Sequence, residues 1–254
     1  MAPQSQRDAE LYALLHRGHA GDVDFYVRRC KQARTVLELG VGYARVASRL
    51  VRTGCHVTGL DRDPGLLVLA RQTIERMQLG SRFSAHLGDM QSFELGSRYD
   101  RVLIPYSALF CLLDDSAVSE CLERCRRHLA PHGRLLLDVY AADGFHSECE
   151  PSDQADDERE PIVSLNHDGR QLTVYERSSW DKPRQRLDVH YDYFDQRGDL
   201  VHTATIEQRY LLQDQLERHL LAVGLAPVSV HGGFGGEALD SDSETLVIEA
   251  TLES

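Results

Sequence analysis

The sequence predicts an α/β protein in which helices cover both faces of a mainly parallel β-sheet and an antiparallel β meander is inserted. The first two-thirds of the chain alternates short apolar runs, typical of buried strands, with stretches of helical spacing. Residues 171–210 then change to runs of period two, separated by turn-forming sequences. These two patterns give the fold class before any single residue is considered.

The elements of the first part follow in order. Residues 45–52 form the first helix after the first strand. A further helix over 64–78 is capped by Asp63, has Pro64 at its first position and is followed by Gly80. A helix over 116–129 is expected to end at Pro131 and Gly133. The strands between them are predicted at 36–39, 57–60, 83–86, 101–104 and 134–140.

The sequence pattern changes from residue 148 onward. Residues 148–160 are polar and acidic and are interpreted as a linker, and three alternating runs form the meander after it. A helix over 213–223 ends at Gly224, and strands at 228–231 and 245–250 complete the chain. We therefore predict N-terminal lid helices in 1–30, a main domain made of 31–145 and 211–254, and an inserted subdomain in 146–210.

The charge balance and the apolar runs of the chain indicate which partners and which cellular compartment to expect. The 254 residues include 28 Lys and Arg against 40 Asp and Glu, a net charge of −12, which argues against nucleic acid and anionic membranes as partners. Apolar runs reach only about five residues, far below the ~20 that span a bilayer. The polar N-terminus lacks the apolar segment of a secretory signal. We expect a cytoplasmic protein.

Cysteine and histidine usage predicts no metal site. The six cysteines include no pair separated by two residues, and the closest pair, Cys121 and Cys125, is interpreted as two reduced residues on a helix face. The twelve histidines form none of the clusters that bind zinc.

The turn after the first strand carries the chemistry. It runs from Glu38 through Gly40 and Gly42, and its glycines let a ligand approach the backbone closely. A dinucleotide-binding turn needs a third glycine where this chain has Arg45. The Glu38 carboxylate would also repel a pyrophosphate, whereas it suits a cofactor that carries an ammonium group. The same acid and glycines resemble the first motif of the class I S-adenosylmethionine-dependent methyltransferases, with Ala44 at the place of the last glycine.

Further motifs extend this resemblance in the right order. Asp61 closes the second strand, where an acid can accept both ribose hydroxyls, and Arg62 follows it. The resemblance implies that Asp89 contacts the adenine amino group and that Met90 packs on the ring. It also implies that Ile104, at the end of the fourth strand, lines the cofactor pocket. The family fold is a Rossmann-like sheet of seven strands whose last strand is antiparallel. S-adenosyl-L-methionine is accordingly the predicted cofactor, although Asp61 alone would also serve NAD.

The N-terminal segment looks like the lid of small-molecule N-methyltransferases, including glycine methyltransferases and aminosugar N,N-dimethyltransferases. In those enzymes a tyrosine near the start closes over the cofactor, and Tyr12 matches it best. His16, His19 and Tyr106 are the candidate catalytic residues, because an amine acceptor must lose a proton. The alternative is that they are packing residues: Tyr12 and His16 share a helix face by their spacing, and Tyr106 supports the turn at Pro105.

Aromatic residues of the meander leave three interpretations open. They line an acceptor pocket, form the packed face of the sheet, or make a dimer interface; the residues are Tyr175, Trp180, Tyr191, Tyr193 and Tyr210. The stretch from Pro105 to Leu113 lacks the glutamates of protein arginine methyltransferases, and the N-P-P-Y motif of enzymes that methylate amino groups of bases is absent.

We therefore predict a methyltransferase that acts on a small-molecule acceptor at nitrogen or oxygen, without nucleic acid or membrane as partner, and with a homodimer possible. The alternative is a sensor or scaffold that binds the cofactor without turnover.

Overall fold

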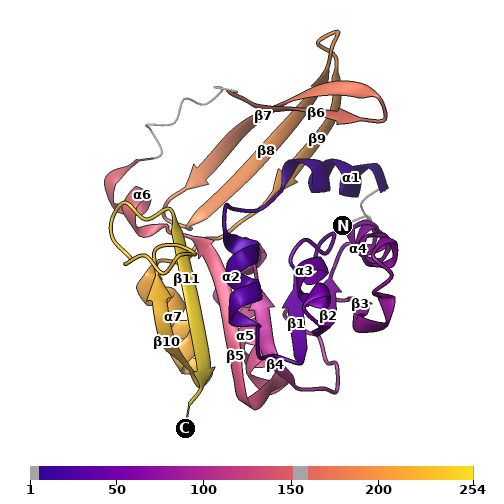
Figure 1. Cartoon of the computed structure of the whole chain (residues 1–254). Helices are drawn as coiled ribbons and strands as arrows, with labels where there is room; N and C mark the ends of the chain where they lie inside the picture. Colours follow the sequence, from indigo (N-terminus) through magenta and orange to yellow (C-terminus); the bar gives the residue numbers. More distant parts are fainter. Residues whose placement is uncertain (1–5, 151–159, 254) are drawn as a thin grey trace.

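A seven-stranded sheet forms the base of the molecule in the computed structural model, which describes residues 6–150 and 160–253 (Figure 1). The strand order is β10-β11-β5-β4-β1-β2-β3, and β11 is antiparallel to both of its neighbours. The other pairs are parallel, which confirms the predicted fold class. The strands are β1 Thr35–Leu39, β2 His56–Asp61, β3 Phe83–Leu87, β4 Tyr99–Ile104, β5 Leu129–Tyr140, β10 Leu225–His231 and β11 Thr245–Leu252.

Helices cover both faces of this sheet, as the alternating sequence predicted. One apolar cluster joins a face of the sheet to residues of α5 and α7, and the other joins the opposite face to α2, α3 and α4. A parallel sheet needs this double cover because both of its faces are apolar. The helices are α1 Gln6–Leu15, α2 Asp22–Arg29, α3 Ala47–Arg52, α4 Pro64–Arg76, α5 Asp115–His128, α6 Asp143–Glu148 and α7 Gln213–Ala222, with short 3-10 turns η1 Gly80–Arg82 and η2 Ala108–Cys111.

Helix α4 begins as predicted and ends earlier. The Asp63 carboxylate accepts hydrogen bonds from the second and third N–H groups of the helix, at 2.7 and 3.0 Å. At the other end, the helix stops at Arg76, two residues before the predicted end at Gln78, where a φ of 58° turns the chain. Gly80 instead begins η1.

Strand β5 is five residues longer at its start than the sequence indicated. The chain passes from α5 directly into the strand, which includes Pro131 and Gly133 rather than stopping before them. Leu129 pairs with Tyr99, and Arg134 pairs with Arg101, so the four intervening residues form an irregularity opposite one residue of β4. Such a bulge accommodates a proline that has no N–H to donate.

The meander has four antiparallel strands rather than three. They are β6 Glu160–His167, β7 Arg170–Asp181, β8 Arg186–Asp195 and β9 Leu200–Ile206, in sequence order. The sequence analysis missed β6, because Ile162 and Val163 are adjacent apolar residues and both are exposed, so the strand lacks an alternating face. Part of the predicted linker, residues 151–159, lies outside the described residues. The proposed domain boundaries stay a prediction.

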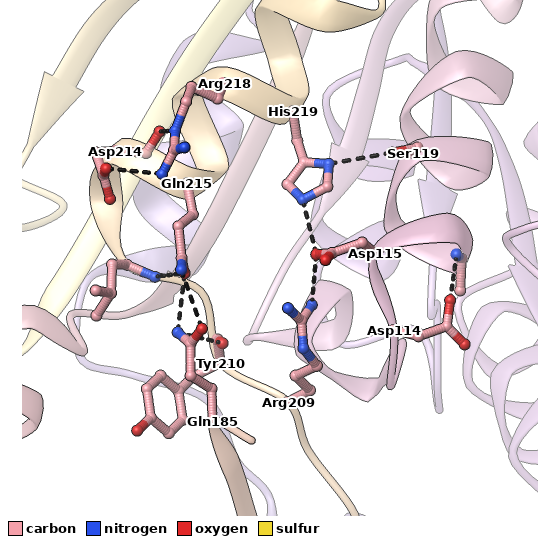
Figure 2. A network of polar contacts seen from close by, with 12 residues as sticks. Asp114, Asp115, Ser119, Gln185, Arg209, Tyr210, Asp214, Gln215, Arg218 and His219 are labelled. Carbon is pink, nitrogen blue, oxygen red and sulfur yellow. Dashed lines mark hydrogen bonds and ion pairs between the residues drawn. The ribbon is translucent and has the colours of Figure 1, made fainter. Parts of the chain in front are cut away.

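The four-stranded sheet lies over the N-terminal helix. Leu11 of α1 is fully buried in a cluster with Val174 of β7 and Tyr193 of β8, and Figure 1 shows α1 running beneath this sheet. The return from β9 to the main sheet is held by polar contacts, in which Arg209 forms an ion pair with Asp115 of α5 at 2.9 Å (Figure 2). His219 of α7 contacts the same carboxylate at 3.1 Å. This network ties the meander to the helices of the main domain.

Candidate cofactor and acceptor site

The site lies where β1, β2, β4 and β5 end, under the N-terminal segment. After β1 the chain turns through Gly40, Gly42 and Ala44, whose φ values are 66°, 54° and 66°. Only glycine adopts this left-handed conformation without strain, so the two glycines account for the turn and Ala44 bears some strain. The turn brings the backbone N–H of Gly42 toward β2.

Glu38 is a buried carboxylate that lacks a full set of partners. It is 2% exposed, and its Oε2 atom has no hydrogen-bond partner among the described residues. Burial raises its pKa to about 8, against the opposing effect of the Arg45 guanidinium and an N–H from Ala47. A buried polar atom without a partner requires an explanation. An ammonium group on a bound cofactor would supply the missing donor and the missing positive charge.

Asp61 stands at the end of β2, beside the glycine turn. Its Oδ2 accepts the Gly42 N–H at 2.7 Å and its Oδ1 accepts the Asp63 N–H at 2.9 Å. Each oxygen keeps a further acceptor site, because a carboxylate has about four lone-pair directions. The arrangement fits a diol with two hydroxyl donors. Arg62 is exposed next to it.

The predicted adenine side of the pocket comes from β3 and β4. Asp89 is half-buried, and its carboxylate accepts the backbone and side-chain N–H groups of Gln91, at 2.9 and 3.1 Å. Met90 packs against the apolar cluster that contains the fully buried Ile104. These residues line the same edge of the sheet as Asp61, since β3 and β2 are paired. Their contact with a cofactor remains a prediction.

His16 lies at the centre of a group of aromatic rings. Its ring centroid is 4.3 Å from that of Tyr12, 5.2 Å from that of Tyr191 and 6.3 Å from that of Tyr106. The side chain is largely buried, and burial lowers its pKa to about 4, so the imidazole is neutral at pH 7. No hydrogen bond of its ring nitrogens to another described residue is present.

The remaining catalytic candidates meet in the same region. The His19 ring lies 5.0 Å from Tyr106 and 6.1 Å from Phe234, between centroids. The Arg45 guanidinium lies 5.5 Å from the Tyr106 ring and forms an ion pair with the buried Asp22, at 2.6 Å. The structure therefore brings His16, His19 and Tyr106 together, and their catalytic role stays a prediction.

Several neighbours of this site were missed from the sequence. Phe234 belongs to the glycine-rich segment before β11, where no motif marked it. Asp138 is fully buried at the end of β5, and burial raises its pKa to about 6. A single acid inside the apolar run of residues 135–139 was the signal that could have identified it, because an unpaired carboxylate rarely lies in a core.

The aromatic residues of the meander divide among the interpretations left open. Tyr193 and Tyr210 are fully buried in packing, and Tyr210 receives a hydrogen bond from Trp180 at 2.9 Å. Tyr191 faces His16, at the predicted acceptor side. Tyr175 pairs with Asp192 and so lies on the opposite face of the sheet, with its ring 5.4 Å from Phe194.

Two properties of the described residues bear on the function. In residues 6–150 and 160–253, no helix combines the length and the apolar character needed to cross a membrane. The same part of the chain contains no group of three or more His, Cys, Asp or Glu side chains arranged to hold a metal ion.

Comparisons with known proteins find methyltransferases among the similar sequences and structures. Residues 36–133 match the family described as a methyltransferase domain. A dTDP-3-amino-3,4,6-trideoxy-alpha-D-glucopyranose N,N-dimethyltransferase from Streptomyces venezuelae is 24% identical over 245 residues, 91% of this chain and 95% of that protein. A Geobacillus sp. (strain WCH70) protein, whose name places it among the methyltransferases, is 32% identical over 43% of each chain, so this match spans less than half of that relative.

The solved structure of the CcbJ methyltransferase from Streptomyces caelestis has the same fold, with a TM-score of 0.78 and 24% identity over 92% of this chain and 89% of that one. These matches show similarity to a methyltransferase domain over residues 36–133 and a common fold over most of the chain.

Proposed function

We propose that this enzyme methylates the amino nitrogen of a small polar acceptor, of the amino-sugar type. The observation that carries the proposal is the neutral imidazole of His16, buried among three tyrosine rings without a hydrogen-bond partner among the described residues. The similarity to the Streptomyces venezuelae N,N-dimethyltransferase over 91% of the chain supports a nitrogen acceptor.

The cofactor-binding roles form the first part of this proposal. S-adenosyl-L-methionine, the proposed cofactor, would supply a methyl group activated on a sulfonium. Glu38 would bind its ammonium group, Asp61 would accept the ribose hydroxyls beside the Gly40–Gly42 turn, and Asp89 with its neighbour Met90 would hold the adenine. Arg62, Ile104 and Tyr12 would complete the pocket. The buried Glu38 oxygen without a partner supports this assignment, because the ammonium would satisfy it.

The acceptor roles form the second part. An amine attacks through its lone pair, so it must be neutral when it reacts. A neutral His16 ring nitrogen accepts a hydrogen bond from the amine N–H and thereby directs the lone pair away from itself. With a pKa of about 4, His16 is a weak base, so we assign it orientation rather than proton removal. His19 and Tyr106 border the acceptor, and His19 is the candidate that takes the proton released by the methylated nitrogen.

The surrounding rings exclude water from the reacting atoms. Tyr12, Tyr106 and Tyr191 enclose the imidazole, and the meander covers them from above. Aromatic faces also attract the positive charge that develops on the nitrogen. These features favour an amine over a carboxylate or phenolate acceptor, which would bring a negative charge to the same place.

The experiment has two stages. Calorimetric titration with S-adenosylmethionine and, separately, with NAD establishes the cofactor. Transfer from radiolabelled S-adenosylmethionine is then measured on matched panels of amines, phenols and carboxylates, with amino-sugar nucleotides among the amines. We expect transfer to amines alone. Transfer only to phenols or carboxylates would refute the nitrogen assignment, and tight binding without transfer to any panel would favour the sensor or scaffold alternative.

The proposal also covers the setting of the reaction. It is a cytoplasmic reaction on a free small molecule, in keeping with the acidic net charge of −12. Nucleic acid and membranes are not partners in this proposal, and a homodimer remains a possible assembly that sedimentation would detect.

A further inference from the structure

Two consecutive residues after β4 have a strained backbone. Tyr106 and Ser107 have φ values of 60° and 55°, in the left-handed region that only glycine adopts at no cost. Strain of this kind is unfavourable and persists only where surrounding contacts impose it. The turn therefore needs hydrogen bonds that hold it in this conformation, and strained residues of this kind cluster at functional sites.

Asp138, at the end of β5, supplies these hydrogen bonds. Its Oδ2 accepts the N–H of Tyr106 at 3.0 Å, and its backbone carbonyl accepts the N–H of Ser107, also at 3.0 Å. The hydroxyl of Tyr26 donates to the other carboxylate oxygen, Oδ1. Tyr26 is itself fully buried in α2. A fully buried carboxylate thus accepts one hydrogen bond from the strained turn and one from a helix of the N-terminal region.

The same turn is the surface on which the N-terminal segment rests. The backbone N–H of Gly18 acts on the pKa of the Tyr106 hydroxyl and lowers it, and the Tyr106 ring contacts His19 and the Arg45 guanidinium. Gly18 has a φ of 85°, and a Cβ there would lie 2.2 Å from Cζ of Arg45. Tyr106, Arg45 and the backbone of the segment are therefore in close contact, with no space between them for a side chain on Gly18.

We propose that Asp138 and Tyr26 are positioning residues, which hold the Tyr106–Ser107 turn so that the N-terminal segment closes over the acceptor. This inference rests on the proposed function for its link to catalysis, while the positioning itself can be measured without any acceptor. Ionised Asp138 accepts both donors, whereas protonation converts one of its oxygens into a donor that cannot accept the Tyr106 N–H equally well.

Other groups around Asp138 also affect its protonation. Asp22 on α2 and His19 on the N-terminal segment lie close enough to shift its pKa, the first upward and the second downward. The hydrogen bond from Tyr26 favours the ionised form, so removing that hydroxyl raises the pKa of Asp138.

The test is hydrogen exchange of individual amides in the full chain between pH 5 and pH 8, with each rate divided by its intrinsic rate. In the wild-type protein, protection of the Tyr106 amide should fall about tenfold as Asp138 is protonated, since charge-assisted bonds are roughly twice as strong as neutral ones. In Asp138→Asn the amide can still accept this N–H, so protection should be intermediate and independent of pH. Tyr26→Phe should move the midpoint to higher pH.

Two comparisons make the test decisive. Tyr175→Phe, on the outer face of the meander, should leave the midpoint unchanged. The Ser107 amide, which bonds to the backbone of Asp138, should vary less with pH than its neighbour. A Tyr106 protection that is independent of pH in the wild-type protein, or an unmoved midpoint in Tyr26→Phe, would overturn the inference. Failure of methyl transfer with these exchange results intact would instead refute the proposed function.

Discussion

Replacement of Asp61 by alanine tests the cofactor assignment most directly. If the carboxylate accepts the ribose hydroxyls, the variant loses a charge-assisted hydrogen bond of about 1.5–3 kcal/mol, which corresponds to roughly 10- to 150-fold weaker binding of S-adenosylmethionine. Asp61 also accepts the N–H groups of Gly42 and Asp63. The variant therefore loses stability as well, by about 1–3 kcal/mol for donors left without a partner.

A matched control separates these two effects. Asp100, at the start of β4, accepts the N–H groups of Arg34 and Thr35 at 2.7 and 3.0 Å, which is the same type of contact at the opposite end of the sheet. Asp100→Ala should lower the free energy of unfolding by a similar amount and leave cofactor affinity unchanged. Affinity is measured by calorimetry well below the melting temperature, and stability by urea denaturation. If both variants bind S-adenosylmethionine with equal affinity, the assignment of Asp61 to the ribose is refuted.

Four further predictions concern the proposed site. The folded-state pKa of Glu38 is about 8, against an ordinary value of 4.5, so its contribution to stability falls as pH rises from 4.5 to 8. Binding of the cofactor ammonium at pH 7 should therefore release a proton from Glu38. The variant Glu38→Gln should abolish this release, which calorimetry in buffers of different ionisation enthalpy detects. Gly18→Ala should displace the Arg45 guanidinium and reduce turnover, because a Cβ has no space there, while a circular dichroism spectrum unchanged from wild type shows that the sheet remains. Tyr12→Phe should weaken cofactor binding by about 0.5–1.5 kcal/mol if its hydroxyl makes one neutral hydrogen bond. Methyl transfer by the wild-type enzyme should survive treatment with a metal chelator.

The main sheet was predictable because its signals are local. A buried strand, a glycine turn and a capped helix such as the one after Asp63 are each specified within a few residues, and their order in the sequence gives the topology. The order of acids and glycines after β1 and β2 then placed the predicted cofactor residues at one edge of the sheet. The errors in this region, at Gln78 and Pro131, concern the ends of elements, where a single residue in a left-handed conformation or a bulge decides the boundary.

The acceptor side was less predictable because its contacts are long-range. Asp138 is 112 residues from Tyr26 and 32 from Tyr106 in the sequence, and only the fold brings the three together. The strain at Tyr106 is invisible in a sequence that gives tyrosine no reason to adopt a positive φ. Residues that catalyse by being held in place need a second residue to hold them, and that second residue comes from whichever element the fold places nearby. A lone acid in an apolar strand is the one trace of this requirement that the sequence carries, so buried acids of this kind merit mutation alongside the motifs.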